Sequence, residues 1–112
     1  MQVCIGVAKG IDYLHTGFKT ALVHRDIKTD NILLDQDYTP KICDFGLSKA
    51  LSLRKGKSSV VLTERICGTK AYLPPEALKG HISRRLDVYS FGVVSIIDIE
   101  NIIVVNRSSL FK

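Results

Sequence analysis

One polar stretch of the sequence could carry out chemistry. Residues 24–31 read His-Arg-Asp-Ile-Lys-Thr-Asp-Asn. Transfer of a phosphoryl group to a hydroxyl needs an acceptor for the hydroxyl proton, a cation beside the transferred group and oxygen ligands for magnesium. Asp26, Lys28 and Asn31 provide these groups within six residues. A polar loop of this kind, taken alone, is usually a solvated turn. The surrounding sequence must therefore show whether this loop has a function.

A second motif, Asp44-Phe45-Gly46, directly follows the apolar run Lys41-Ile42-Cys43. A carboxylate at the end of a strand can turn toward a metal when a glycine two residues later frees the backbone. The tripeptide alone is a weak signal. Its position 13 residues after Asn31, with a strand-like pair between them, strengthens it.

Two further motifs follow in order. Residues 68–76 read Gly-Thr-Lys-Ala-Tyr-Leu-Pro-Pro-Glu, and residues 87–92 read Asp-Val-Tyr-Ser-Phe-Gly. Each has a plain structural interpretation, the first as a turn into a proline-started helix and the second as an ordinary helix. The four motifs in this order make chance a poor explanation.

Composition limits the classes of protein. A chain of 112 residues allows one domain or part of one, and 46% hydrophobic with 24% charged residues is typical of a chain that packs a core. The net charge of +5 comes from dispersed cations, which argues against nucleic-acid binding. Three separated cysteines favour neither a disulfide framework nor a zinc site. We expect a cytoplasmic chain without a signal peptide or transmembrane segment.

Helical periodicity frames the motifs. Residues 1–16 space apolar side chains three and four apart, which predicts an amphipathic helix ending at Gly17, a residue suited to a left-handed cap. Pro74 opens a short helix, since proline fits a first helical turn. Residues 85 to about 100 predict a core helix, apolar on most faces and largely buried. Its apolar positions are Val88, Phe91, Val93, Val94, Ile96 and Ile97.

The stretches between these helices predict short strands and one long loop. Leu22-Val23, Ile32-Leu34 and Lys41-Cys43 are short apolar runs between turn-forming residues, which is typical of strands. Residues 48–69 lack periodicity and predict a long mobile segment, and loops of such length are usually functional. The fold class is therefore mainly α with a few short β-strands.

In this order, the motifs resemble the C-terminal lobe of a eukaryotic-type protein kinase domain. The run Asn31-Ile32-Leu33-Leu34-Asp35, the lysine at 28, and Gly68-Thr69 with Ala71-Tyr72 resemble the Ser/Thr kinases of the Pelle/IRAK (interleukin-1 receptor-associated kinase) and plant receptor-like group. The resemblance implies a partial, α+β kinase domain over residues 1–94. Within it, the catalytic loop is 24–31, the activation segment 44–76 and the core helix about 85–100, and residues 95–112 form a divergent tail.

The resemblance implies roles for individual residues. Asp26 matches the catalytic base, and Lys28 matches the side chain that steadies the transferred phosphoryl group. Asn31 and Asp44 match the magnesium ligands, so Lys28, Asn31 and Asp44 would contact the ATP-magnesium cofactor.

Further residues match regulatory and structural positions. Arg25 resembles the arginine that pairs with an activation-segment phosphate, and Thr63 is the best candidate for carrying that phosphate. Thr69 resembles the residue that contacts the base and the lysine. Asp87 resembles a buried aspartate that holds the catalytic loop by backbone hydrogen bonds. The structural set is His24, Phe45, Gly46, Glu76 and Asp87.

The sequence departs from the family in two ways. The chain supplies no glycine-rich loop, strand lysine or paired glutamate for the ATP phosphates, and the family pattern stops near Ser95. We therefore expect a truncated or mis-spliced gene product that is inactive in isolation. The arginine that pairs with Glu76 is also missing.

Two functional hypotheses follow. The first is a serine/threonine kinase fragment that uses ATP and Mg2+ to phosphorylate a protein substrate in an innate-immune-like signalling pathway. It would work with an upstream receptor or adaptor complex, in the cytoplasm or at the inner face of the plasma membrane through that complex. The alternative is a catalytically inactive truncated kinase that acts as an interaction module through its activation segment. A nucleic-acid binder rests on net charge alone and ranks far below both.

Overall fold

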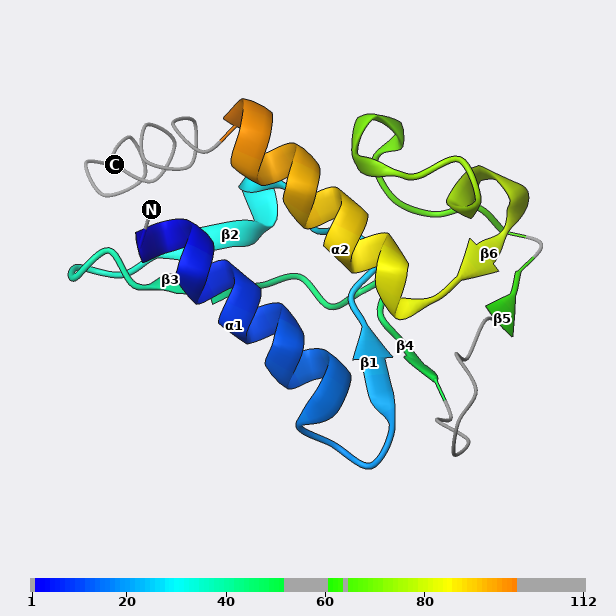
Figure 1. Cartoon of the computed structure of the whole chain (residues 1–112), viewed down its shortest axis with the longest axis horizontal. Coiled ribbons are helices and arrows are strands. Elements are labelled where there is room, and N and C mark those ends of the chain that lie inside the picture. Colours follow the sequence, from blue (N-terminus) through cyan, green and yellow to red (C-terminus); the bar gives the residue numbers. More distant parts are fainter. Residues whose placement is uncertain (1, 52–60, 64, 99–112) are drawn as a thin grey trace.

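Two antiparallel helices form the body of the molecule. The structure, a computed structural model, describes residues 2–51, 61–63 and 65–98. Helix α1 (Gln2–Thr16) and helix α2 (Arg84–Val93) pack side by side, and α2 continues as a π-helical turn, η4 (Val94–Asp98) (Figure 1). Residues 99 and 100 of the predicted core helix, and the tail from 99 to 112, lie outside the described residues.

The buried stripe of α1 follows its sequence pattern. Val3, Val7, Ile11 and Leu14 are buried, which confirms the predicted amphipathic helix. The helix ends at Gly17 without a left-handed residue, so that expectation was wrong. The Gly17 amide donates to the Tyr13 carbonyl at 2.7 Å, and a Cβ there would lie 2.6 Å from that oxygen. Glycine is therefore needed for close approach.

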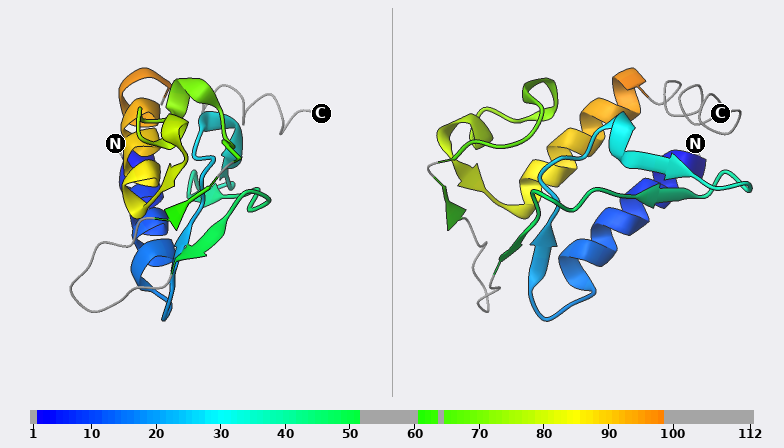
Figure 2. Two further views of the ribbon diagram at one scale, coloured as in Figure 1. Left: turned by 90° about the vertical axis from the view of Figure 1, so that its right-hand side faces the viewer. Right: turned by 180° about the vertical axis from the view of Figure 1, so that it is seen from behind.

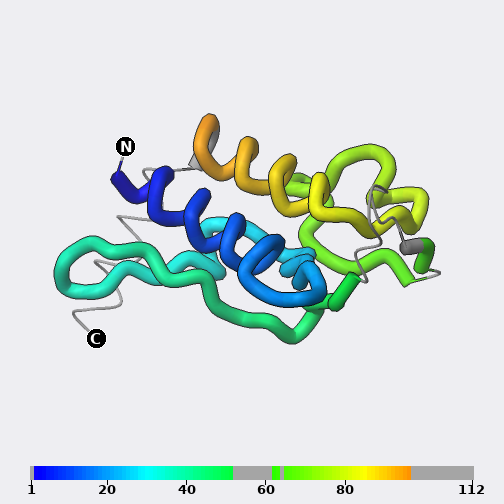
Figure 3. Tube along the Cα trace, turned by 60° about the horizontal axis from the view of Figure 1, so that its bottom comes forward, coloured from blue at the N-terminus to red at the C-terminus, as the bar shows by residue number. Residues whose placement is uncertain are grey.

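Short antiparallel strand pairs lie beside the two helices (Figure 2). Strand β2 (Ile32–Leu34) pairs with β3 (Pro40–Ile42), and this hairpin runs along α1 (Figure 3). Strand β1 (Ala21–Val23) pairs with β4 (Lys49–Leu51), and β5 (Val61–Leu62) pairs with β6 (His81–Ile82). The three predicted strands are β1, β2 and β3, each within a residue or so of its expected bounds.

The segment predicted to be one long loop is partly strand. Strand β4 and strand β5 lie inside residues 48–69, so the prediction was wrong at residues 49–51 and 61–62. Only Leu51 of β4 is fully buried, and its partner across the ladder is Ala21. A three-residue strand with one buried position carries no periodicity of its own, so pairing with β1 selects it. Residues 52–60 and 64 lie outside the described residues.

Helix α2 is less buried than its sequence suggested. Val88 is 58% exposed and Ile96 is 85% exposed, so the prediction that these residues are buried was wrong. The side facing the protein instead carries Leu86, Asp87 and Ser90, followed by Val94 in η4. Two of these are polar, and hydropathy alone assigns polar side chains to the surface.

In the part of the chain that the structure describes, three buried clusters hold the elements together. The largest joins α1 to β2, to η4 and to Ile27 between strands β1 and β2, and its buried members are Val3, Val7, Ile11, Ile27, Ile32, Leu34 and Val94. A second joins the β1–β4 pair to β6, and its members are Ala21, Val23, Leu51 and Ile82. The third joins Leu73 and Ala77 to Leu86 of α2. The polar loop from 24 to 31 thus lies between packed elements.

Candidate active site

The loop from 24 to 31 is anchored through its middle. Ile27 is fully buried in the largest cluster, whereas its neighbours Asp26 and Lys28 are half-buried at the surface. The loop ends in the 3-10 turn η1 (Thr29–Asn31), where the Asn31 amide donates to the Lys28 carbonyl at 3.0 Å. An apolar residue between two charged ones therefore fixes both charged side chains at one edge of the core.

A buried carboxylate of α2 binds the start of this loop. Asp87 is fully buried, and it accepts hydrogen bonds from the backbone amides of His24 at 2.8 Å and Arg25 at 2.9 Å. Arg25 has a φ of 75°, a conformation that costs about 1–3 kcal/mol for a residue other than glycine. The two charge-assisted hydrogen bonds offset that strain.

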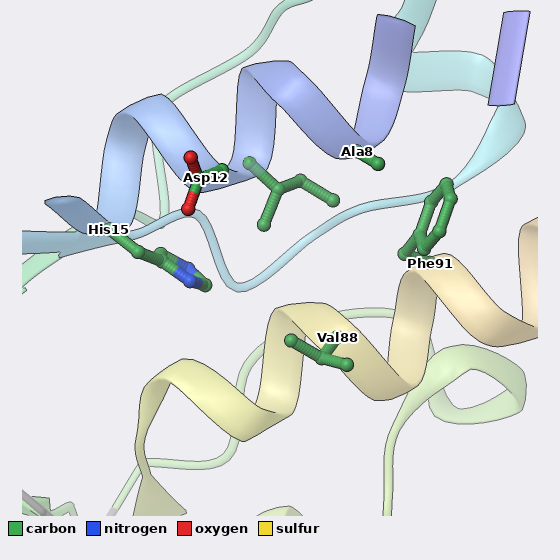
Figure 4. Close-up of a pocket in the computed structure, with 6 residues that line it drawn as sticks. Ala8, Asp12, His15, Val88 and Phe91 are labelled. Atoms are coloured by element: carbon green, nitrogen blue, oxygen red, sulfur yellow. The ribbon is translucent and has the colours of Figure 1, made fainter. Parts of the chain in front are cut away.

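His15 of α1 contacts the same carboxylate and was missed by sequence reasoning. Its Nε2 lies 2.8 Å from Asp87 Oδ2, and because an ionised carboxylate only accepts, Nε2 donates. Figure 4 shows the His15 side chain projecting from α1 toward α2, beside a groove of about 280 Å³ that Val88 and Phe91 also line. His15 lies four residues after Ile11, on the buried stripe, so its spacing could have revealed it.

His24 joins the loop to the motif that begins at Asp44. Its Nδ1 accepts from the Asp26 amide at 3.1 Å, so Nε2 carries the hydrogen and donates to the Cys43 carbonyl at 2.7 Å. The Cys43 amide in turn donates to the Asn31 carbonyl at 2.9 Å. These bonds fix the backbone just before Asp44 against both ends of the loop.

Four predicted site residues converge on one point. Lys28 Nζ donates to Thr69 Oγ1 at 3.1 Å, and Thr69 Oγ1 donates to Asp26 Oδ1 at 3.3 Å. Asn31 Nδ2 donates to the Asp26 carbonyl at 2.8 Å and to Asp26 Oδ2 at 3.2 Å. The Lys28 ammonium lies 3.8 Å from Asp26 Oδ2. The Asp26 carboxylate is thus oriented from both sides next to a cation.

The motif from 44 to 46 is a tight turn at the surface. Asp44 has a φ of 58°, is exposed, and accepts from the Gly46 amide through Oδ1 at 3.3 Å. The Phe45 ring packs edge-on against His24, with ring centroids 5.0 Å apart, yet Phe45 is 45% exposed. Burial, and then the charge of Asp44, raise the pKa of the Cys43 thiol, so Cys43 is a poor nucleophile near neutral pH.

The predicted regulatory residues are not brought together. Arg25 Nη1 donates to the Leu47 carbonyl at 3.4 Å, and Arg25 Nε is buried without a hydrogen-bond partner. Thr63 follows β5, where its amide donates to the Gly80 carbonyl at 2.8 Å and its hydroxyl contacts the Arg65 backbone. Within the described residues, Thr63 makes no hydrogen bond to Arg25.

Glu76 acts through its backbone. Its carbonyl accepts from the amides of Lys79 at 3.1 Å and His81 at 3.1 Å, which closes the 3-10 turn η3 (Ala77–Lys79) and starts β6. Its exposed side chain forms no ion pair with any residue that the structure describes.

Ser90 is a second residue that sequence reasoning missed as part of the site. It is 1% exposed on α2, and its hydroxyl lies 2.6 Å from the Tyr72 carbonyl and 3.1 Å from the Leu86 carbonyl. Ser90 follows Asp87 by three residues, so the two share one side of the helix.

Comparison with known proteins finds one family model and several similar sequences. The family model of the protein kinase domain matches residues 1–109. The chain is 47% identical over 96 residues to a probable LRR receptor-like serine/threonine-protein kinase of Arabidopsis thaliana, covering 85% of this chain and 10% of that protein. It is 48% identical over 94 residues to LysM domain receptor-like kinase 10 of Oryza sativa subsp. japonica, covering 84% and 15%.

A third relative is similar to the same degree. The G-type lectin S-receptor-like serine/threonine-protein kinase SD1-1 of Arabidopsis thaliana is 48% identical over 95 residues, which cover 84% of this chain and 11% of that protein. The chain therefore spans only about a tenth of the length of these curated relatives. Among the described residues, neither helix has the length and apolar character needed to cross a bilayer.

Proposed function

Because this chain belongs to the protein kinase domain family, we propose that it carries the catalytic residues for phosphoryl transfer from ATP to serine and threonine hydroxyls of a protein substrate. The observation that carries the proposal is the convergence of Lys28 and Thr69 on the Asp26 carboxylate. A carboxylate, an ammonium and an oriented hydroxyl at one point are the groups that this chemistry needs.

Asp26 is the proposed base. It accepts the proton of the substrate hydroxyl as the hydroxyl oxygen forms its bond to the γ-phosphorus of ATP and the bond from that phosphorus to the leaving ADP oxygen breaks. A carboxylate offers about four lone-pair sites, so Asp26 can accept this proton while Thr69 and Asn31 hold its orientation. Lys28 supplies positive charge beside the transferred group, where negative charge is spread over the phosphoryl oxygens.

The donor set fits a magnesium-nucleotide. ATP supplies the phosphoryl group, and Mg2+ neutralises charge on its phosphates. The two hydrogen bonds of the Asn31 side chain both use its nitrogen, which leaves the amide oxygen for a cation, and Asp44 presents an exposed carboxylate. The described residues contain no group of three or more His, Cys, Asp or Glu that could hold a metal. Few protein ligands suit Mg2+, which takes its remaining ligands from water and phosphate.

The test is transplantation. Residues 1–94 would replace the matching segment in the kinase domain of a receptor-like relative, and transfer of labelled phosphate to a protein substrate would be measured. Asp26→Ala should lower kcat by roughly 10²–10⁴-fold. Asp30→Ala, an exposed residue of the same loop, is the matched control and should leave kcat unchanged. Near-normal turnover by the Asp26→Ala chimera would contradict the proposal.

Regulation through Arg25 and Thr63 is part of the proposal. Arg25 Nε is a buried donor without a partner, and an anion placed beside it would satisfy that donor. A phosphate on Thr63 adds about −1.5 to −2 charges and three acceptor oxygens, which suit a guanidinium. For the two to meet, Thr63 must leave its contacts with Gly80 and Arg65.

In the chimera, Arg25→Ala and Thr63→Ala should each lower activity, and the double variant should lose little more than either. Strictly additive losses would remove the pairing.

A second candidate function is an interaction module that binds through the segment 61–79. Among the described residues of this segment, three large apolar side chains are exposed: Leu62 at 71%, Ile66 at 48% and Leu78 at 44%. Exposed apolar groups of this kind favour contact with another protein. Binding of a protein substrate that survives Asp26→Ala but is lost in Leu62→Ser with Ile66→Ser would support a binding surface. Binding of the protein substrate without phosphoryl transfer in the wild-type chimera would favour this function over catalysis.

The cellular setting is proposed from the relatives. They are named as receptor-like kinases, which supports an upstream receptor or adaptor complex and a cytoplasmic site of action, in solution or at the inner face of the plasma membrane. The innate-immune-like pathway rests on the sequence resemblance. Capture of a receptor complex by the tagged chain in plant cells would test both.

A further inference from the structure

We propose that Ser90 is a positioning residue, which holds the Thr69 hydroxyl against Lys28 and Asp26 by binding the turn that follows Thr69. The inference rests on the proposed function in one respect, since the site that Ser90 positions is the proposed phosphoryl-transfer site. Ser90 contacts neither Asp26 nor Lys28 in any hydrogen bond among the described residues, so it acts through another residue.

The direction of the Ser90 hydrogen bond follows from distance. A hydroxyl carries one hydrogen, and the Ser90 hydroxyl lies near two carbonyl oxygens. The Tyr72 carbonyl is at 2.6 Å and the Leu86 carbonyl, one turn back on α2, is at 3.1 Å. The shorter contact takes the hydrogen, because O–H···O bonds are strongest near 2.7 Å. Ser90 therefore donates across to a separate segment, with its contact to its own helix secondary.

The segment that Ser90 binds leads directly to Thr69. Tyr72 is the last residue of the 3-10 turn η2 (Lys70–Tyr72), and its amide donates to the Thr69 carbonyl at 2.9 Å. One compact turn thus separates the anchored carbonyl from the Thr69 hydroxyl that contacts Lys28 and Asp26. A shift of η2 must move that hydroxyl.

Helix α2 consequently holds both halves of the site. Asp87 binds the loop that carries Asp26 and Lys28, and Ser90, three residues later, binds the turn that carries Thr69. Both side chains are buried, where hydrogen bonds are shielded from water. One rigid element therefore sets the distance between the two loops.

Packing offers a competing explanation. Leu73 and Ala77 pack with Leu86 of α2, and Tyr72 packs against the largest cluster. These contacts alone could hold η2, and the Ser90 hydrogen bond would then be a consequence of that packing. The two explanations differ in what removal of the hydroxyl does. Packing would keep η2 closed and Thr69 in place, whereas the proposed role requires both to change.

Hydrogen exchange on the 112-residue chain separates them. The Tyr72 and Leu73 amides report opening of η2, since they donate to Thr69 and Lys70 carbonyls. Ser90→Ala should speed their exchange about fivefold to tenfold, the effect of one lost hydrogen bond. The matched control is Ser95→Ala, because Ser95 donates within its own helix, to the Phe91 carbonyl at 2.8 Å or the Gly92 carbonyl at 3.2 Å. It should leave both amides unchanged.

A second readout follows the site itself. The ¹⁵N signal of the Lys28 side chain should move in Ser90→Ala in the direction that it moves in Thr69→Ala, and Ser90→Thr, which keeps the hydroxyl, should restore it. Unchanged exchange at Tyr72 and Leu73, or an unmoved Lys28 signal, would overturn the proposal. If Ser90→Ala unfolds the chain, Ser90→Cys, a weaker donor, must show the faster exchange, and its failure to do so would also overturn it.

These readouts involve no ATP. A chain that shows them but transfers no phosphate in the chimera would contradict the proposed function and leave the role of Ser90 as an anchor of Thr69 intact. Normal phosphoryl transfer by the chimera, with amide exchange unchanged in Ser90→Ala, would support the proposed function and contradict the role of Ser90.

Discussion

The loop from 24 to 31 and the segment from 61 to 79 meet at Asp26 and Thr69, but the two are anchored very differently. The loop is held by a fully buried carboxylate that accepts two of its backbone amides, and by Ile27 in the largest cluster. The segment is held by the β5–β6 pair, by the Ser90 hydroxyl on the Tyr72 carbonyl, by packing of Tyr72 on the largest cluster and by the small cluster of Leu73, Ala77 and Leu86. Among its described residues, Leu62, Ile66 and Leu78 are exposed.

The difference assigns different tasks to the two regions. Buried charge-assisted hydrogen bonds make the loop a fixed support for Asp26 and Lys28. Apart from the Thr69 hydroxyl, the described anchors of the segment are neutral hydrogen bonds, apolar packing and a short strand pair, so we expect it to have a lower free energy of local opening and to be the part that a modification or a bound protein can move. The proposed catalytic residues Asp26 and Lys28 thus lie on the fixed loop, and the proposed phosphate acceptor Thr63 lies on the adjustable segment.

Removal of the buried carboxylate should have the largest effect. Asp87→Ala leaves the buried His24 amide, the partly buried Arg25 amide and His15 Nε2 without their acceptor and should lower the free energy of unfolding by about 3–5 kcal/mol. Urea denaturation measures this loss. The control is Asp12→Ala, an exposed position, which should change stability by less than about 0.5 kcal/mol. Similar losses for both variants would contradict the claim that the buried carboxylate anchors the loop.

Apolar truncation should separate the regions next. Ile27→Ala empties a fully buried position and should lower the free energy of unfolding by about 2–5 kcal/mol. Leu62→Ala acts on a side chain that is 71% exposed and should change the free energy of unfolding by less than about 0.5 kcal/mol. The same denaturation experiment compares them. A costly Leu62→Ala would show that the segment from 61 to 79 is packed more tightly than the structure indicates.

Removal of the Thr69 hydroxyl, where the two regions meet, should lower the free energy of unfolding by a smaller amount. Thr69→Val keeps the shape of the side chain but removes its hydrogen bonds with Lys28 and Asp26, so it should cost about 0.5–1.5 kcal/mol at this partly buried site. Thr16→Val removes an exposed hydrogen bond to the Asp12 carbonyl and should cost less. A larger loss for Thr16→Val would contradict the coupling of the two regions through Thr69.

The smallest predicted effect concerns the thiol beside Asp44. Burial, and secondly the Asp44 charge, raise the pKa of Cys43, so less of it is thiolate at a given pH and its alkylation at pH 8 should be slower than that of a free cysteine. Asp44→Asn should speed the reaction, because it removes the second cause. Mass spectrometry of iodoacetamide-treated chain measures both rates. Slower alkylation after Asp44→Asn would reverse the sign and contradict the assignment.

The sequence predicted the helices and strands with strong periodicity. Helix α1 and strands β1 to β3 have apolar repeats of their own, so pattern alone located them. Strand β4 has one buried residue and is selected by its partner, so no local pattern marks it. The exposure of Val88 was also invisible, because a helix with apolar residues on several faces does not say which face is covered.

The candidate site shows the same division. Motif order placed Asp26, Lys28, Asn31 and Thr69 on the list of site residues, and the structure brings their side chains together. The buried polar residues behind them, His15 and Ser90, were missed. The spacing of His15 on the buried stripe marks it as buried, but its role, like that of Ser90, depends on a partner that is distant in the sequence.

The most direct test of the account compares amide exchange in the two regions of the unmodified chain. The His24 and Arg25 amides, bound to Asp87, should exchange only when the whole chain unfolds. The Thr63 and Tyr72 amides should exchange at least about tenfold faster after correction for intrinsic rates, because local opening of the segment from 61 to 79 suffices. Equal protection of the four amides would show one cooperative unit and contradict the claim that a fixed loop supports an adjustable segment.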